Sequence, residues 1–286
     1  MYILSLDFGS TNFKYLLLKI IEDEKKADVK IIGKGRSIAT DFAKFIYDIL
    51  EKYNIKIDEI EKVLATGTGS SFLDNSFESV EIIKIDEFNA IAYGGLILSK
   101  KENGYIVSIG TGTTIVYSDF KTIDRIGGTG LGGGSLVGLG SAILSDIENE
   151  NRKVVAFKTL IDMAKKGDKS NVDLMIGDIN KGSIGNMTSD ITAANFAAMQ
   201  KNANKYDFIA ATLNLILENI SLIVKSLCKD YPVIYIGTMV SDDYVKSCLE
   251  KIADYTGNEI CFVDDSEYAI VIGSWEYYLL NIRKNY

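Results

Sequence analysis

The sequence of 286 residues contains no histidine. This absence excludes Ser-His-Asp and Cys-His catalysis, zinc sites with imidazole ligands, and histidine general bases. A general base in this chain therefore has to be a carboxylate, with lysine and tyrosine as the weaker alternatives.

Cysteine, basic charge and long apolar runs are also scarce. The three cysteines, Cys228, Cys248 and Cys261, form no C-x-x-C pair and are odd in number, which indicates reduced thiols in a cytosol. A net charge of −8 argues against a nucleic-acid surface. No apolar run reaches membrane-spanning length, and the start, MYILSLDFGS, lacks the basic region and cleavage site of a signal peptide. We therefore expect a cytoplasmic protein that binds neither nucleic acid nor membrane.

Glycine, in contrast, is concentrated in one stretch, DRIGGTGLGGGSLVGLG, from Asp124 to Gly140. Because glycine loses more backbone freedom on ordering than any other residue, we expect no helix or strand core within this density. Backbone that approaches a phosphate and turns N–H groups toward it explains the composition, and the apolar residues at its end could open a helix aimed at the same ligand. A flexible linker would be richer in serine and poorer in apolar residues. The spacing of Gly128, Gly130 and Gly133 also satisfies G-x-G-x-x-G, a dinucleotide motif that belongs after the first strand of a βαβ unit.

Two hairpins carry glycine and hydroxyl residues in their turns. Residues 2–6 and 15–21 are predicted strands, and Asp7 and Lys14 flank the turn between them. This turn offers N–H and hydroxyl donors to a phosphate, and Asp7 can hold Mg²⁺ or its waters, although ordinary hairpin turns have a similar composition. Residues 106–117 repeat the pattern, and a third such turn follows a strand at Gly237. The repetition predicts an internal duplication with a ligand held between the halves.

Other elements follow from apolar periodicity and capping residues. Asp86 and Glu87 precede a predicted helix at 88–98, where acidic residues complement the helix dipole, an explanation that suffices for one of them. Further predicted strands lie at 62–66, 80–85, 233–236 and 260–263, and further helices at 42–50, 154–164, 195–227 and 268–280. Residues 22–30 are predicted as a solvated hairpin tip or loop, and 177–189 as a loop.

These motifs together resemble the type II (eukaryotic-like) pantothenate kinases of the actin/sugar-kinase/Hsp70 superfamily. The resemblance runs nearly end to end, and its more specific parts are the glycine run preceded by Arg125 and two downstream blocks. Its motifs are the Asp7–Lys14 hairpin, Asp86-Glu87-Phe88, SIGTGT at 108–113, RIGGTGLGGG at 125–134, AKKGD at 164–168, NVDL at 171–174, DITAANF at 190–196 and YIG at 235–237.

The resemblance implies an α/β fold with two ribonuclease-H-like lobes, residues 1–100 and 101–286, and ATP in the cleft between them. It implies ATP-dependent phosphorylation of pantothenate to 4′-phosphopantothenate, usually by a homodimer, and leaves open whether coenzyme A or its thioesters inhibit the enzyme. Glu87 would be the general base, and Arg125 would bind the pantothenate carboxylate with Thr111 and Thr114 lining the substrate and phosphate region. Asp7 would lie near Mg²⁺. The implied ATP-binding residues are Gly9, Ser10, Thr11, Asn12, Lys14, Thr111, Gly132, Gly133, Gly134, Ser135 and Thr238.

The first turn departs from the family pattern, because Ser10 replaces a common glycine, and the loop at 182–188 lacks the usual prolines. Three alternative functions stay open: a kinase of another small alcohol, an ATPase that activates a dehydratase, and a non-catalytic ATP-binding regulator. The dehydratase activators typically carry cluster-binding cysteines, for which this chain offers no obvious pair. The Walker pattern is absent, which argues against a P-loop kinase.

Overall fold

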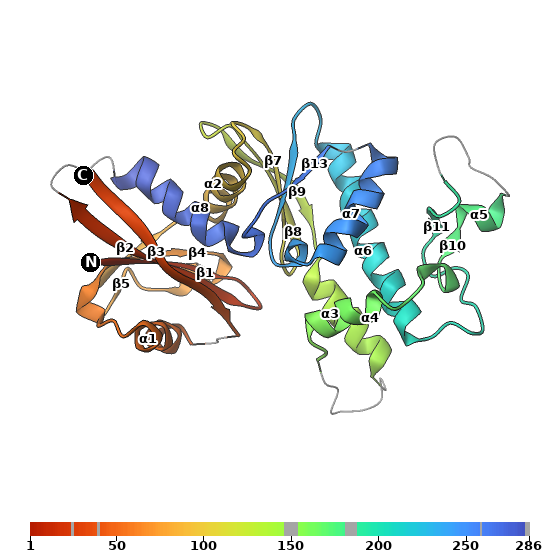
Figure 1. The fold of residues 1–286 in the computed structure, drawn as a ribbon, viewed down its shortest axis with the longest axis horizontal. Coiled ribbons are helices and arrows are strands. Elements are labelled where there is room, and N and C mark those ends of the chain that lie inside the picture. The colour runs from red at the N-terminus through yellow and green to blue at the C-terminus, as the bar shows by residue number, and fades with distance from the viewer. Residues whose placement is uncertain (24–25, 39–40, 146–153, 181–187, 258, 284–286) are drawn as a thin grey trace.

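Two mixed β-sheets form the framework of the protein (Figure 1). The computed structural model describes residues 1–23, 26–38, 41–145, 154–180, 188–257 and 259–283. The first sheet has the order β3-β2-β1-β4-β6-β5. Its strands are β1 (Tyr2–Phe8), β2 (Phe13–Asp23), β3 (Lys26–Ser37), β4 (Ile60–Thr66), β5 (Ser76–Phe77) and β6 (Val80–Lys84).

The second sheet repeats the arrangement of the first, with the order β13-β12-β7-β8-β9. In both sheets three consecutive antiparallel strands continue into parallel neighbours, β4 beside β1 and β12 beside β7. Its strands are β7 (Gly104–Ile109), β8 (Thr113–Ser118), β9 (Ile123–Thr129), β12 (Val233–Ile236) and β13 (Ile260–Phe262). The internal duplication predicted from the two hairpins is therefore present in the topology.

Helices separate and cover the sheets in layers (Figure 1). Helix α1 (Phe42–Tyr53) covers one face of the first sheet, and α6 (Lys205–Leu227) and α7 (Asp243–Thr256) cover the far face of the second. Between the sheets lie α2 (Glu87–Ser99) and α8 (Ala269–Tyr277). A smaller region contains α3 (Gly133–Leu144), α4 (Phe157–Ala164), β10 (Leu174–Met175), α5 (Ile176–Ile179) and β11 (Thr192–Ala194).

The two central helices cross at unusually close range. A Cβ added to Gly273 would lie 1.9 Å from the carbonyl oxygen of Ala90, and one added to Gly94 would lie 2.0 Å from that of Ala269. Helix α8 contacts β1 and β4 of the first sheet, whereas α2 contacts β7, β8 and β12 of the second. The division of the chain at residues 100 and 101 stays a prediction. With that division, α2 of the first half packs against the second sheet, and α8 of the second half packs against the first sheet.

The glycine run does not exclude regular structure, so that expectation is wrong. Strand β9 includes Gly127 and Gly128, and α3 begins at Gly133. Several of these glycines are needed because backbone or side chains from other elements lie against them: a Cβ on Gly128 would lie 2.5 Å from the Thr113 carbonyl oxygen. Close packing within the protein therefore accounts for part of the glycine content.

Two other expectations need correction, and a third is confirmed in one of its alternatives. The stretch 22–30, predicted as a hairpin tip or loop, lies at the closed end of the β2–β3 hairpin, and its described residues are paired strand residues. The long helix starts at Lys205 and not near residue 195, since the Phe196 N–H donates to the buried Asp173 carboxylate at 2.8 Å and Asn204 caps the helix. Helix α5 occupies the start of the predicted loop at 177–189, of which 181–187 lie outside the described residues.

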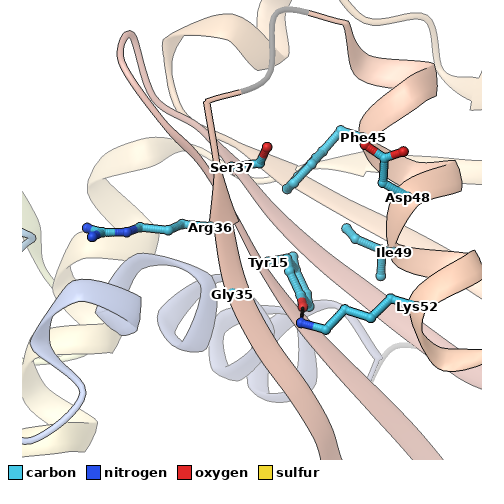
Figure 2. Close-up of a pocket in the computed structure, with 8 residues that line it drawn as sticks. All are labelled: Tyr15, Gly35, Arg36, Ser37, Phe45, Asp48, Ile49 and Lys52. Atoms are coloured by element: carbon cyan, nitrogen blue, oxygen red, sulfur yellow. Dashed lines mark hydrogen bonds between the residues drawn. The ribbon is translucent and has the colours of Figure 1, made fainter.

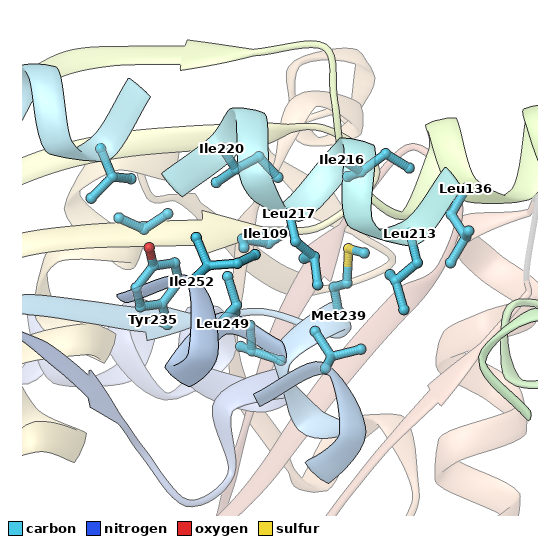
Figure 3. Close-up of a cluster of buried hydrophobic side chains, with 14 of the residues drawn as sticks. Ile109, Leu136, Leu213, Ile216, Leu217, Ile220, Tyr235, Met239, Leu249 and Ile252 are labelled. Atoms are coloured by element: carbon cyan, nitrogen blue, oxygen red, sulfur yellow. The ribbon is translucent and has the colours of Figure 1, made fainter. Parts of the chain in front are cut away.

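Helix α6 is the core helix that its apolar spacing predicted. It packs against the second sheet and α7 through residues including Leu213 and Leu217, and α7 contributes Leu249 to the same cluster (Figure 3). By length and hydropathy alone α6 also meets the criteria for a membrane span, but 67% of its most apolar stretch is buried inside the protein. We therefore assign α6 to the core.

Candidate active site

The first predicted turn places two charged side chains at the end of the first sheet. Asp7 and Lys14 are register partners on β1 and β2, and Lys14 Nζ lies 3.7 Å from Asp7 Oδ2. Both side chains are buried. Burial raises the pKa of the Asp7 carboxyl, and the Lys14 ammonium opposes that rise. On the other side of Asp7, Gly67 has φ +85°, and a Cβ there would lie 2.6 Å from Asp7 Oδ1.

Glu87 lies beside this pair at the first turn of α2. Asp86 caps the helix by accepting hydrogen bonds from the N–H groups of Phe88 and Asn89, at 2.9 and 3.1 Å. This leaves the half-buried Glu87 carboxyl free of the capping role. Its pKa is raised, first by burial and then by the charges of Asp7 and Asp86. Of the two acidic residues at the helix start, one is a cap and the other is a carboxyl with a perturbed pKa.

The turn after β1 and the turn after β7, both predicted to bind phosphate, contact each other although they are about a hundred residues apart in the sequence. Thr111 Oγ1 accepts a hydrogen bond from Ser10 Oγ at 3.1 Å and lies 2.5 Å from Thr11 Oγ1. Gly9 and Asn12 complete the first turn, where a Cβ on Gly9 would lie 3.0 Å from the Asn12 carbonyl oxygen. The predicted ATP-binding residues of both halves therefore meet at one place.

The glycine run is docked onto the second turn. The N–H groups of Gly133 and Gly134 donate to the carbonyl oxygens of Gly110 and Thr111 at 2.8 and 2.9 Å. A Cβ on Gly132 would lie 2.7 Å from the Thr111 oxygen, and Ser135 Oγ donates to the Gly130 carbonyl oxygen at 3.0 Å. The N-terminus of α3 is thus braced against Thr111 by main-chain contacts.

Arg125 and Thr114 lie on neighbouring strands of the second sheet, Arg125 opposite Val116 and Thr114 two residues nearer the turn at 110–112. Thr114 is paired with Gly128, and a Cβ on Gly128 would be 3.4 Å from Thr114 Cα and 3.5 Å from Arg125 Nη2. The guanidinium is exposed and has no hydrogen bond or ion pair to any other residue that the structure describes. An unpaired guanidinium beside a threonine can bind a carboxylate with charge-assisted hydrogen bonds.

Thr238 follows β12 in the third predicted turn. Gly237 before it has φ +107°, and a Cβ there would lie 2.4 Å from the Ile109 carbonyl oxygen, next to the second turn. The Gly237 N–H donates to the Ser266 carbonyl oxygen at 2.8 Å. Thr238 therefore adjoins the turns that contain Thr111 and the α3 N-terminus.

The residues around Asp7 fit a hydrated Mg²⁺ ion. Mg²⁺ in kinases is usually held by one or two carboxylates together with phosphates and waters. Asp7 supplies one buried carboxylate, and the neighbouring Thr66 hydroxyl is buried with no hydrogen-bond partner in the part of the chain that the structure describes. The described residues include no cluster of three or more acidic, cysteine or histidine side chains suited to an all-protein metal cage.

Two surface cavities lie outside this constellation. One of about 160 Å³ is formed by α1, β2 and β3, on the opposite face of the first sheet from Asp7 (Figure 2). In it Lys52 donates to the Tyr15 hydroxyl, while Arg36 points away. The other, of about 380 Å³, lies along α3 and is mostly apolar; it shares only Gly134 with the site.

Comparison with known proteins identifies the family. The family model named Fumble matches residues 13–259 of the chain. The chain belongs to the Fumble family. Relatives of this Fumble protein include the type II pantothenate kinase of Oceanobacillus iheyensis, 32% identical over 72% of this chain and 79% of that one. The type II pantothenate kinase of Staphylococcus aureus strain bovine RF122 is 28% identical over 94% of this chain and 97% of that one.

Solved structures agree with this Fumble protein in fold. The activator of 2-hydroxyisocaproyl-CoA dehydratase from Clostridium difficile, solved with bound ADPNP, superimposes with a TM-score of 0.66 over 100% of this chain and 97% of that one, at 17% identity. Component A of the (R)-2-hydroxyglutaryl-CoA dehydratase of Acidaminococcus fermentans gives 0.65 over 97% of each chain, at 19% identity. These likenesses confirm the predicted fold class of two ribonuclease-H-like lobes. At such identities they bear on the fold alone.

The sequence did not identify two residues that adjoin the predicted site. Thr66 and Gly67 adjoin Asp7 from β4, and only the parallel pairing of β1 with β4 brings them there. The signal available was the Thr-Gly-Thr-Gly sequence after a predicted strand, which repeats the glycine–hydroxyl theme. It had no charged residue to mark it.

Proposed function

We infer that the protein is a pantothenate kinase that transfers the γ-phosphoryl group of ATP to pantothenate, giving 4′-phosphopantothenate and ADP. This reaction is the first step of coenzyme A synthesis. The observation that carries the inference is the Fumble match across residues 13–259, which includes Glu87, Thr111, Thr114 and Arg125. The relatives named type II pantothenate kinase extend over most of the chain.

We propose Glu87 as the general base. As the pantothenate hydroxyl oxygen bonds to the γ-phosphorus, the bond from that phosphorus to the bridging oxygen breaks and Glu87 takes the hydroxyl proton. The raised pKa of Glu87 supports the role, because a base acts best when its pKa approaches the working pH. Most of the remaining acceleration in phosphoryl transfer comes from position and charge.

Arg125 is the proposed partner of the pantothenate carboxylate, with Thr114 and Thr111 lining the path to the phosphate. Support comes from the exposed guanidinium beside Thr114, which pairs with no other residue that the structure describes. A planar fork of N–H groups suits a carboxylate. This arrangement orients the substrate with its hydroxyl toward Glu87.

ATP is the proposed phosphoryl donor, and its phosphates would bind between the two hairpin turns. The hydroxyls of Ser10, Thr11 and Thr111 lie together there, Lys14 adds positive charge, and Gly9 and Asn12 shape the turn. Gly132, Gly133, Gly134 and Ser135 act by fixing the Thr111 turn, and Thr238 adjoins it. Asp7 would hold Mg²⁺, which neutralises phosphate charge when bound.

Further parts of the proposal concern regulation and assembly. We propose a cytoplasmic homodimer, with coenzyme A or its thioesters as candidate inhibitors. The type II pantothenate kinase resemblance supports these parts. Size-exclusion chromatography with light scattering and inhibition assays with coenzyme A test them directly.

The decisive experiment measures ADP release with and without pantothenate. The wild type should release ADP only when pantothenate is present. Glu87→Gln should lower kcat about 10²- to 10⁴-fold with little change in KM, the range typical of a general base. Arg125→Ala should raise KM for pantothenate about 10- to 100-fold, as for the loss of a hydrogen bond to a charged group. ATP binding without any response to pantothenate would refute the substrate and leave the nucleotide site intact.

A further inference from the structure

The hydroxyl of Thr66 is buried at the end of β4 and has no hydrogen-bond partner among the residues that the structure describes. Thr66 is 0% exposed, so solvent does not supply the missing bond. A buried unpaired polar atom lowers stability, and valine would fill the same volume without that cost. A threonine at this position therefore needs an explanation outside the packing of the core.

The position of Thr66 points to Asp7. The two residues are register partners on the parallel strands β1 and β4, so their side chains project from the same face of the sheet. This is the face that Leu64 shares with the helices between the sheets. Because the two residues are neighbours across the strand pair, a small rotation of the Thr66 side chain brings its hydroxyl within reach of the Asp7 carboxylate.

Asp7 is itself short of partners. Among the described residues its buried carboxylate has Lys14 as its one polar side-chain partner, at 3.7 Å. A carboxylate can accept about four hydrogen bonds. An underused acceptor thus lies beside an unused donor.

Other hydroxyls nearby do not share this state. Ser5 Oγ donates to the Val271 carbonyl oxygen at 2.8 Å, and Ser70 Oγ donates to the Gly67 carbonyl oxygen at 2.7 Å. Of these three hydroxyls, Thr66 alone has no partner among the described residues.

We propose that Thr66 is a positioning residue for Asp7: its hydroxyl donates a hydrogen bond to the Asp7 carboxylate while Asp7 holds Mg²⁺ with the nucleotide. The inference rests on the proposed function, through the role of Asp7. Carboxylates that ligate metals are themselves hydrogen-bonded, and loss of such a partner typically weakens metal binding 10- to 100-fold. The hydroxyl thus stabilises the site when Mg²⁺ and nucleotide are bound, and its unmade hydrogen bond lowers the stability of the ligand-free protein.

The test compares Thr66→Val, which removes only the hydroxyl, with Thr66→Ser, which keeps it. Binding of AMP-PNP, a non-hydrolysable ATP analogue, is measured by calorimetry across a Mg²⁺ titration and again in EDTA. For Thr66→Val we expect the Mg²⁺ concentration at half-saturation to rise about 10- to 100-fold, with AMP-PNP affinity in EDTA unchanged. Thr66→Ser should restore the wild-type Mg²⁺ dependence.

Thermal unfolding of the ligand-free variants separates positioning from a structural role. Thr66→Val should unfold at the wild-type midpoint or above it, because no bond is lost. Ser274→Ala is the matched control. It removes another buried hydroxyl, on α8 next to Gly273, that has no hydrogen-bond partner among the described residues. It should leave the Mg²⁺ titration unchanged.

Two results would overturn the proposal. One is a Thr66→Val protein with wild-type Mg²⁺ dependence, and the other is an equal loss of AMP-PNP affinity in EDTA. The assay contains no pantothenate, so it separates the proposal from the substrate. The wild type could fail to phosphorylate pantothenate while Thr66→Val still needs more Mg²⁺ than the wild type to bind AMP-PNP. That result would refute the substrate and support the positioning role.

Discussion

Glu87 lies half-buried at the first turn of α2, with two other carboxylates close by. Its pKa is raised by burial, by Asp7 and by Asp86, in that order. Only the ionised form can take a proton from the substrate hydroxyl, so activity is present above this pKa and is lost as the pH falls through it. The acid limb of kcat/KM should therefore lie above the ordinary range of a glutamate.

Asp86→Asn tests which group produces that limb. Asparagine caps a helix about as well as aspartate, so α2 should stay intact, while one of the charges that raise the pKa of Glu87 is removed. The acid limb of kcat/KM should move to lower pH, as measured by initial rates across a pH series. Asp48→Asn, which removes an equal charge from α1, should not move it. An unmoved limb in Asp86→Asn would mean that Glu87 is not the titrating base.

Two glycines of helix α3, Gly134 and Gly138, have opposite surroundings. A Cβ on Gly134 would lie 2.6 Å from Thr111 Cγ2 and 2.9 Å from the Thr111 carbonyl oxygen, whereas a Cβ on Gly138 would meet nothing within 4 Å. Gly138→Ala should stabilise the protein by about 0.5–1 kcal/mol through helix propensity. Gly134→Ala should displace the Thr111 turn and raise KM for ATP.

Steady-state kinetics and thermal unfolding of the two alanine variants give the comparison. The pair is matched in helix, residue type and substitution. Equal effects of Gly134→Ala and Gly138→Ala on KM would show that α3 does not brace the turn.

Strands and turns were predictable from the sequence where one physical signal dominated. Apolar runs marked β1, β2, β4, β7, β8 and β12, and Asp86 with Glu87 marked the start of α2. Strand β9 was missed because its glycines serve a contact with Thr113, which the sequence does not display. The helix α3 at the end of the glycine run was predicted from its apolar residues. Helix α7 was missed as well, although its buried residues Val245, Leu249 and Ile252 are three or four positions apart, as in an amphipathic helix.

The candidate site also has a part that local sequence predicts and a part that only the tertiary fold produces. The Asp7–Lys14 pair follows from hairpin register and was foreseeable from local sequence. The contact of Ser10 and Thr11 with Thr111 joins residues about a hundred positions apart, so only the tertiary fold produces it. The same holds for Thr66, which reaches Asp7 through a parallel strand pair.

At the scale of the whole molecule, the crossing of α2 and α8 joins the halves. A Cβ on Gly273 would lie 1.9 Å from the Ala90 carbonyl oxygen and 2.3 Å from the Gly94 N atom. Gly273→Ala should therefore destabilise the protein by more than about 2 kcal/mol, since neither backbone can yield locally. Urea unfolding measures the loss. Ser274→Ala, at the next residue, should be neutral, and similar losses in both variants would show that the crossing is not tightly packed.

The core between the sheets should make unfolding cooperative. Ile3 and Leu64 of the first sheet share one apolar cluster with Ile106 and Ile234 of the second. We expect a single transition in calorimetry for the whole chain, and no cooperative transition for residues 1–100 alone, because that fragment lacks α8. Two separate transitions would contradict the shared core.

The return of α8 to the first sheet has a consequence during protein synthesis. Strands β1 to β6 end at Lys84, but the helix that covers their inner face begins at Ala269. At about 5 to 20 residues per second, the ribosome needs roughly 10 to 40 s to deliver it. For that interval the nascent chain exposes an apolar sheet face, which makes it a natural client for chaperones that bind at the ribosomal exit.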